Sequence, residues 1–404
     1  MGIKGVPRLL LCMSLLTATS SWAAEIHGRS STQFQSFINE MTSNRRQVEL
    51  DEYLRISITN IDKAGKFSLQ GYGRAAQDFT NGEGFNGRLY YLYGDYRDLF
   101  DKVDLKVGRQ FVNMAAGSAL IDGAQVELKN VGPVAFTVMG GRDVLFGLNG
   151  ELGDGGNTTL GLGAYLTGFK NTDLEVSWFR KWDGGDVSRD VIGVSGKQYL
   201  LNNLKAYGNI RYDIASETVN EFLGGLKYFP TSNLIFTGEY YQSYATFDAT
   251  SIYAVFAVDR YQEGVFRVDY TVNDKVTVNG GYTRQDYGDG ATADVVHVGL
   301  GVRPIEPLRF NVEYDHRNGY YGDLNGFVID GTYDINKASQ VVAGIDYDVY
   351  QRDALTGDET ARRYWLGGKY RFNKAVAVAG RIQEDVNARF SSNVSGRVTL
   401  DYDF

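Results

Sequence analysis

The chain has 404 residues, of which 49 are Gly, 28 Tyr and 22 Phe but only 5 Pro and 1 Cys, and its formal net charge is −8. Gly is well above its usual share of roughly 7 % and shows no collagen period. A hydrophobic content of 43 % excludes a disordered chain. No apolar run of about 18 residues occurs in the body of the chain, which excludes a helical multispan membrane protein. A large, aromatic-rich β protein remains.

The segment Met1–Ala24 has the pattern of a secretory signal. Lys4 and Arg8 precede the apolar run Leu9–Leu16, and a small-residue cleavage site follows. The run is too short to span a membrane, so we expect residues 1–24 to be removed. The only Cys, Cys12, lies in this segment, so the mature chain is predicted to contain no disulfide and no thiolate metal site.

The charge and the histidines exclude several classes of function. Loss of the two cations of the signal segment, which has no acidic residue, changes the net charge from −8 to −10. This acidity argues against a nucleic-acid partner, which needs a basic surface. His27, His297 and His316 are scattered, without the spacing of metal ligands. No nucleophile motif, phosphate-binding loop or haem-attachment motif is present, so we expect no catalytic residue, no metal and no cofactor.

Most of the chain alternates between apolar and polar residues, which is the pattern of half-buried strands. Between Leu308 and Asp315, for example, every second residue is apolar and the others are charged or polar. A soluble sandwich would turn the apolar set toward a core, but so many strands are too many for one sandwich. A membrane barrel places the apolar set against lipid and the charges in an aqueous lumen. Other clear runs are 54–59, 204–214, 266–272, 341–349 and 394–404.

The final strand has a distinctive end. Leu400, Tyr402 and Phe404 alternate with Asp401 and Asp403, and the chain stops at the Phe. This ending resembles the assembly signal of bacterial outer-membrane β-barrels. Together with a signal segment, it predicts export to the outer membrane.

Short and long connections alternate along the chain, as periplasmic turns and extracellular loops do in membrane barrels. Counting hairpins in this way predicts 22 strands, within a range of 18–22, that form one transmembrane antiparallel up-and-down β-barrel from residue 25 to residue 404. Ile252–Val258 is strand-like, but we place it in a loop because it would break the even number. Two long loops, Arg142–Asn157 and Tyr244–Glu263, are expected to fold inward and narrow the lumen. Arg109, after Gly108, is expected near the end of a strand, close to the membrane surface.

Charged residues in the inward phase are the candidate pore lining. Such side chains tune ion selectivity and hold water in a pore, or they pair across strands and stiffen the wall. Both signs occur, so we expect no strong anion preference, with a mild cation preference from the net charge. The candidates are Lys205, Arg211, Asp213, Glu239, Arg267, Asp269, Arg309, Glu313, Asp315 and Arg317.

In its signal segment, alternating strands, alternating connections and terminal Phe404, the chain resembles bacterial outer-membrane porins. The resemblance implies passive diffusion of ions and small hydrophilic solutes, with outer-membrane lipid and the barrel-assembly machinery as partners. It does not extend to TonB-dependent transporters, whose plug domain precedes the barrel. An alternative is a structural sheath, in which the barrel houses a multihaem cytochrome of an electron-transfer conduit. A trimer is implied by the same resemblance, although a barrel of this size also suits a monomer.

Overall fold

The computed structural model describes residues 24–39, 45–80, 84–147, 150–152, 156–245, 259–320, 322–351 and 357–404. The predicted signal segment lies outside these residues except for Ala24, and its cleavage stays a prediction. The strand-like run Ile252–Val258 also lies outside them. No helix long and apolar enough to cross a membrane occurs in the described ranges.

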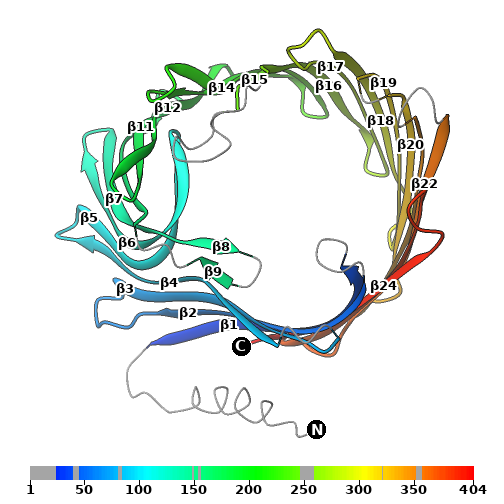
Figure 1. Ribbon diagram of the computed structural model, residues 1–404, viewed down its shortest axis with the longest axis horizontal. Coiled ribbons are helices and arrows are strands. Elements are labelled where there is room, and N and C mark those ends of the chain that lie inside the picture. The colour runs from blue at the N-terminus through cyan, green and yellow to red at the C-terminus, as the bar shows by residue number, and fades with distance from the viewer. Residues whose placement is uncertain are drawn as a thin grey trace, which may run out of the picture.

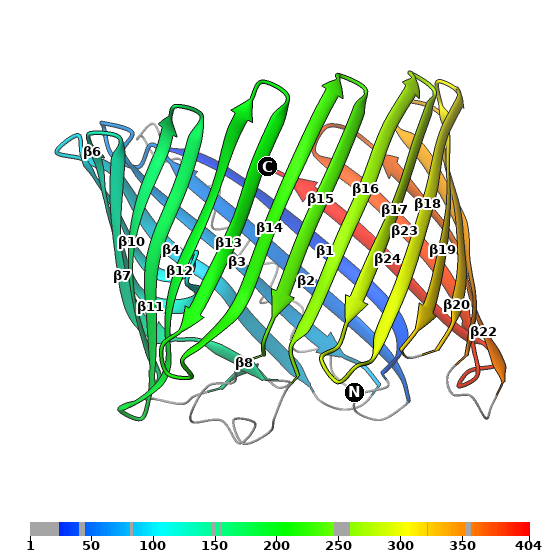
Figure 2. The ribbon, with the colours of Figure 1, turned by 90° about the horizontal axis from the view of Figure 1, so that it is seen from above.

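The chain forms a closed ring of 22 antiparallel strands (Figure 1), which run obliquely across the wall in side view (Figure 2). This confirms the predicted all-β barrel and its strand number. Two further short strands, β8 (Leu145–Gly147) and β9 (Gly150–Leu152), pair only with each other. Successive wall strands are neighbours, and β7 pairs directly with β10.

The first eleven wall strands are β1 (Glu25–Asn39), β2 (Arg45–Thr59), β3 (Phe67–Asp78), β4 (Phe85–Leu99), β5 (Val103–Met114), β6 (Gly117–Val131), β7 (Val134–Asp143), β10 (Thr158–Phe169), β11 (Thr172–Asp183), β12 (Asp186–Leu201) and β13 (Leu204–Asp213). The other eleven are β14 (Thr218–Thr231), β15 (Leu234–Ser243), β16 (Tyr261–Asn273), β17 (Val276–Asp286), β18 (Thr292–Ile305), β19 (Leu308–Gly319), β20 (Leu324–Asp334), β21 (Ser339–Gln351), β22 (Asp358–Arg371), β23 (Val376–Val386) and β24 (Asn393–Asp403).

The two ends of the chain close the barrel. β1 pairs with β2 on one side and with β24 on the other. Gly28 and Phe404 exchange two backbone hydrogen bonds of 2.8 and 3.0 Å. A Cβ atom at Gly28 would lie 2.3 Å from the Phe404 ring, so the last side chain packs directly over this glycine. Because closure leaves no free edge, the ladder satisfies the backbone groups that lipid cannot hydrogen-bond.

The tight connections explain the Asn and Asp between strands. Asn60, Asn130 and Asn171 have positive φ angles of 55°, 58° and 61°. Asn enters this left-handed region more readily than most residues, so it suits the turns that join adjacent strands.

The outer face is apolar and the inner face is polar. On β16, Phe266 and Tyr270 have exposed fractions of 51 % and 41 %, while Arg267 and Asp269 occupy the alternate positions. Large exposed apolar side chains recur around the ring in the same phase. A soluble protein would not expose so much apolar surface, whereas lipid covers it in an outer-membrane barrel.

Candidate functional site: the lumen of the barrel

Water reaches the inner wall. The side chains of Arg267, Arg309 and Arg363 point to the inside of the ring, and their exposed fractions are 54 %, 50 % and 49 %. A packed core would bury them and would have to offset the desolvation of each charge. The inner wall is therefore an aqueous surface that combines both signs of charge.

The predicted residues of β13 separate into different environments. Arg211 forms an ion pair with Glu221 at 2.8 Å, and its Nε donates a 2.7 Å hydrogen bond to the backbone carbonyl of Ala115. Asp213 is buried and accepts a 3.0 Å hydrogen bond from the Ala215 amide, so it orders the following turn. Lys205 lies over the rings of two tyrosines.

The predicted residues of β15 and β16 meet in one cluster. Arg267 is paired with Glu239, which also accepts a hydrogen bond from the Tyr207 hydroxyl. Asp269 lies two residues further along β16 and is exposed. Glu239 is thus held between a cation and a phenol, and Asp269 is open to solvent.

The predicted residues of β19 find partners on different strands. Arg309 pairs with Asp334 at 2.7 Å. Asp315 lies 2.7 Å from Nδ1 of His297. Arg317 donates a 2.7 Å hydrogen bond to the Tyr287 hydroxyl. Glu313, half-buried, has the same inward phase. The ten sequence candidates therefore occupy one face but form several separate clusters.

The β5–β6 hairpin bends into the lumen, which sequence reasoning did not predict. Figure 1 shows its tip inside the ring. The Ala116 amide donates a 2.9 Å hydrogen bond to Ser177 Oγ on the inner face of β11. A Cβ atom at Gly193 of β12 would lie only 2.2 Å from the Ala116 nitrogen. The expectation that the strand ends near Arg109 is wrong, since β5 continues to Met114.

An apolar cluster holds this hairpin against the wall. Phe179, Val191 and Met139 are each 1 % exposed, although they belong to wall strands. They contact residues of the hairpin within one buried group. Burial of a side chain of this size stabilises by about 1.5–3 kcal/mol, so the hairpin is a fixed part of the channel. The members are Val112, Met114, Ala116, Ala119, Ile121, Met139, Phe179 and Val191.

The connection after β7 also enters the ring, as predicted for Arg142–Asn157. Figure 1 places β8 and β9 inside it, next to β4. The Arg88 guanidinium donates a 3.0 Å hydrogen bond to the Gly147 carbonyl, and the Tyr90 and Phe146 rings lie 6.0 Å apart. Most of the second predicted inward loop, Tyr244–Glu263, lies outside the described residues.

Tyrosines gather on the inner wall of β2, β3 and β4. The rings of Tyr72 and Tyr90 stack at 4.9 Å, and Tyr53 and Tyr91 lie on either side at 6.4 and 5.8 Å from Tyr72. A register shift between Tyr72 and Gly73 brings this cluster together. Sequence alternation alone places Tyr90 and Tyr91 on opposite faces. They share the inner face only because β4 carries one extra residue in its ladder with β3, and the sequence does not show this bulge.

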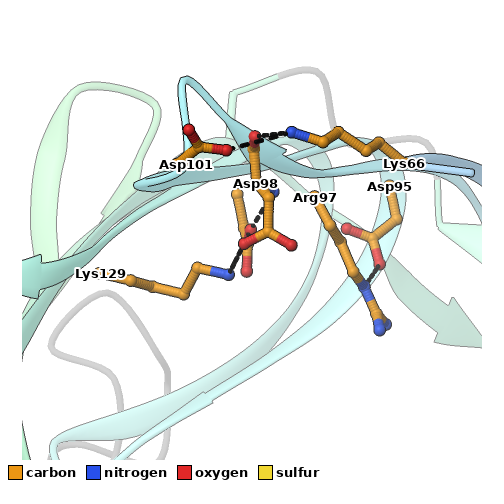
Figure 3. A network of polar contacts seen from close by, with 7 residues as sticks. Lys66, Asp95, Arg97, Asp98, Asp101 and Lys129 are labelled. Atoms are coloured by element: carbon orange, nitrogen blue, oxygen red, sulfur yellow. Dashed lines mark hydrogen bonds and ion pairs between the residues drawn. The ribbon is translucent and has the colours of Figure 1, made fainter. Parts of the chain in front are cut away.

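A charged network lies at the rim formed by the short connections (Figure 3). Lys129 forms ion pairs of 2.8 Å with Asp98 and with Asp104, and Arg97 pairs with Asp95 at 2.9 Å. Lys66 donates a 2.6 Å hydrogen bond to the carbonyl of Asp98. Residues of β4, β5 and β6, which include Asp95, Asp104 and Lys129, also line a polar cavity of about 310 Å³. The network links the short connections to one another, and its charged groups favour a hydrated rim. Among the described residues, no group of three or more potential metal ligands occurs.

Comparison with known proteins adds information on the fold. No protein-family model matches the sequence. No curated protein matches it either. Similar solved structures include OccAB2 and OccAB3 of Acinetobacter baumannii and OccK1 (OpdK) of Pseudomonas aeruginosa, each with a TM-score of 0.50. OccAB2 is 12 % identical to this chain, and the alignment covers 96 % of this chain and 99 % of OccAB2. OccAB3 is 10 % identical, with 95 % and 99 % covered. OccK1 is 9 % identical, with 95 % and 98 % covered. The chain therefore shares the barrel fold of these three proteins over nearly its whole length.

Proposed function

We propose that the chain is a passive channel for ions and small hydrophilic solutes across the outer membrane. The observation that supports this most directly is the inner wall, where arginines such as Arg267 and Arg309 are about half exposed to solvent. A barrel with an apolar outer face and a wet, charged inner face gives polar solutes a path that lipid denies them. The inward hairpin β5–β6 narrows this path.

Selectivity follows from the signs of the wall charges. The ten predicted residues include five cations and five anions, and we propose that they line the pore, with the buried Asp213 supporting the wall from below its surface. Pairs such as Arg267 with Glu239 and Arg309 with Asp334 cancel much of each other's field. A channel with such a wall has no strong anion preference, and the acidic mature chain adds a mild cation preference.

The test is reconstitution of the purified mature protein in planar lipid bilayers and in liposomes. We expect stepwise increases in conductance. In a salt gradient, the reversal potential should lie near zero, with a small shift of the sign that indicates cation preference. Liposome swelling with uncharged solutes of graded size then gives the size limit. Insertion of folded protein with no conductance and no swelling would contradict the proposal. A sealed lumen would then be the conclusion.

The cytochrome sheath is not favoured. The chain's own β5–β6 and β8–β9 hairpins occupy part of the lumen, and a sheath needs that space for its partner. Purification from the native membrane tests this point, because a sheath would bring a haem protein with it. The alternative returns if such a protein purifies in equal amount.

We also propose that the barrel-assembly machinery recognises the last strand. Leu400 and Tyr402 point outward with exposed fractions of 46 % and 40 %, in phase with Phe404. The assembly machinery, which acts at the membrane, can therefore contact Leu400, Tyr402 and Phe404 from outside the barrel. Deletion of Phe404 should lower the amount of folded barrel in cells, while the same protein refolded in detergent should lose much less. Equal losses in both settings would point to packing alone.

A further inference from the structure

The wall has a seam where two neighbouring strands separate. In the described stretch 84–147, the β4–β5 ladder runs from Leu99–Val103 to Leu92–Arg109 and ends there. Beyond it, Phe85–Tyr91 of β4 pair only with β3, and Gln110–Met114 of β5 pair only with β6. We name the gap between these two segments the seam. It exists because the β5–β6 hairpin leaves the wall for the lumen.

Gly108 permits this departure. Its φ angle is +126°, a conformation that other residues rarely adopt. A Cβ atom there would lie 2.3 Å from the backbone oxygen of Leu92 on β4. The strand therefore bends at a point where only glycine fits both the angle and the close approach.

Arg109, the next residue, bridges the seam. Its guanidinium donates hydrogen bonds of 2.8 and 2.7 Å to the Asp122 carboxylate and of 2.9 and 3.2 Å to that of Glu151 on β9. It also donates a 3.1 Å hydrogen bond to the backbone carbonyl of Leu89, on the unpaired edge of β4. The side chain is 11 % exposed. One cation on β5 thus ties its ladder partner β6 to β9 and to the unpaired edge of β4, and no ladder connects these three strands to one another.

Apolar side chains lie on both sides of the seam. Leu89 and Leu92 point outward with exposed fractions of 41 % and 43 %. On the lumen side, Tyr90 contacts the Phe146 ring, and the tyrosine stack continues along the inner wall to Tyr72 of β3. Phe111, on the same face of the hairpin as Arg109, is 65 % exposed. In this sector, stacked rings therefore lie beside a strand edge that has no ladder partner.

We propose that the seam is a lateral route between lumen and bilayer for small amphipathic molecules with a flat ring, and that Arg109 holds it closed. An open strand edge is tolerated at membrane depth only where protein covers it or water lines it. The tyrosines offer ring faces for stacking to a flat apolar body. This route adds to the passage of hydrophilic solutes through the lumen.

The test uses N-phenyl-1-naphthylamine, a flat and mainly apolar aromatic amine with one N–H group, which becomes fluorescent in a bilayer. Vesicles with a lipopolysaccharide outer leaflet resist its direct entry, so protein-dependent entry is measurable. We expect Arg109→Gln to increase the entry rate about threefold or more over the native protein. The matched control is Arg284→Gln, which removes an outward arginine paired with Asp294 on the continuous β17–β18 ladder. It should leave the rate unchanged.

Two further variants separate the seam from folding defects. Asp122→Asn and Glu151→Gln keep the guanidinium and weaken its two ion pairs, so each should increase the entry rate by a smaller factor than Arg109→Gln. Unboiled gel migration verifies that each barrel is folded. If no folded variant differs from the native protein and from Arg284→Gln, the lateral route is refuted. Ion conductance of the same samples tests the hydrophilic channel separately, because that path does not cross the seam.

Discussion

Gly193→Ala tests whether the inward hairpin is seated on the wall. Gly193 lies on the inner face of β12, and its added Cβ would be 2.2 Å from the Ala116 nitrogen and 2.3 Å from the Ala115 carbonyl carbon. Ordinary contact begins near 3.4 Å, so the hairpin tip must move by about 1.2 Å. The obstructing atoms are backbone, and no side-chain rotation relieves the contact.

Such a displacement weakens the hydrogen bonds that hold the tip. The Ala116 amide donates to Ser177 at 2.9 Å, and Arg211 donates to the Ala115 carbonyl at 2.7 Å. A neutral bond contributes about 0.5–1.5 kcal/mol and a charged one about 1.5–3, so a loss of about 2 kcal/mol is expected. At about 1.4 kcal/mol per tenfold change, the opened fraction of the tip rises roughly 30-fold.

The assay is amide hydrogen exchange of the folded barrel in detergent, read at Ala115 and Ala116. Their exchange should accelerate roughly 30-fold in Gly193→Ala, while amides of β19 keep their native rates. The matched control is Gly238→Ala on β15, where an added Cβ meets no atom within 4 Å. If Gly193→Ala exchanges like the control at both amides, the hairpin does not rest on β12 and the reasoning fails.

Three other predictions concern charge, closure and a turn. Arg267→Gln leaves Glu239 without its cation and should raise the cation-to-anion permeability ratio up to about fivefold, because one charge acts with about 1 kcal/mol at 4 Å in water. Glu239→Gln should shift the reversal potential in the opposite direction, and a shift of the same sign contradicts the pairing. Gly28→Ala must displace the Phe404 ring, so overpacking of about 1–3 kcal/mol should lower the heat-denaturation midpoint on unboiled gels; an unchanged midpoint argues against this contact. The backbone amides of Phe67 and Lys66 donate hydrogen bonds to Asp62 and hold the pKa of its carboxyl below the usual aspartate value. These hydrogen bonds therefore stabilise the 62–67 turn fully above the usual aspartate pKa, and the stabilisation is lost as the pH falls through the lowered pKa of Asp62. Asp62→Ala should expose both amides to exchange already at neutral pH, and native protection in that variant would exclude the role of the carboxylate.

Much of the architecture follows from local sequence. Period-2 alternation places Arg309 and Phe310 on opposite faces wherever the strand lies, because successive side chains point to opposite sides of a sheet. The turn residues mark where each strand ends, and their spacing predicts 22 strands. The inward phase of all ten charged candidates is a consequence of the same rule. The sequence shows that the last strand ends in Phe404, but it does not show that this side chain packs over Gly28.

The tertiary structure decided how those faces are used. A bulge in β4 turns both Tyr90 and Tyr91 inward, because one inserted residue changes the phase of everything beyond it. Partners such as Arg211 and Ala115 are 96 residues apart, and the bend at Gly108 brings them together. Arg109 keeps the apolar phase in sequence, yet it bridges the seam because its strand has left the wall. Local pattern determines which way a side chain points where the ladder is regular; the closed barrel determines where that phase changes and what each side chain meets.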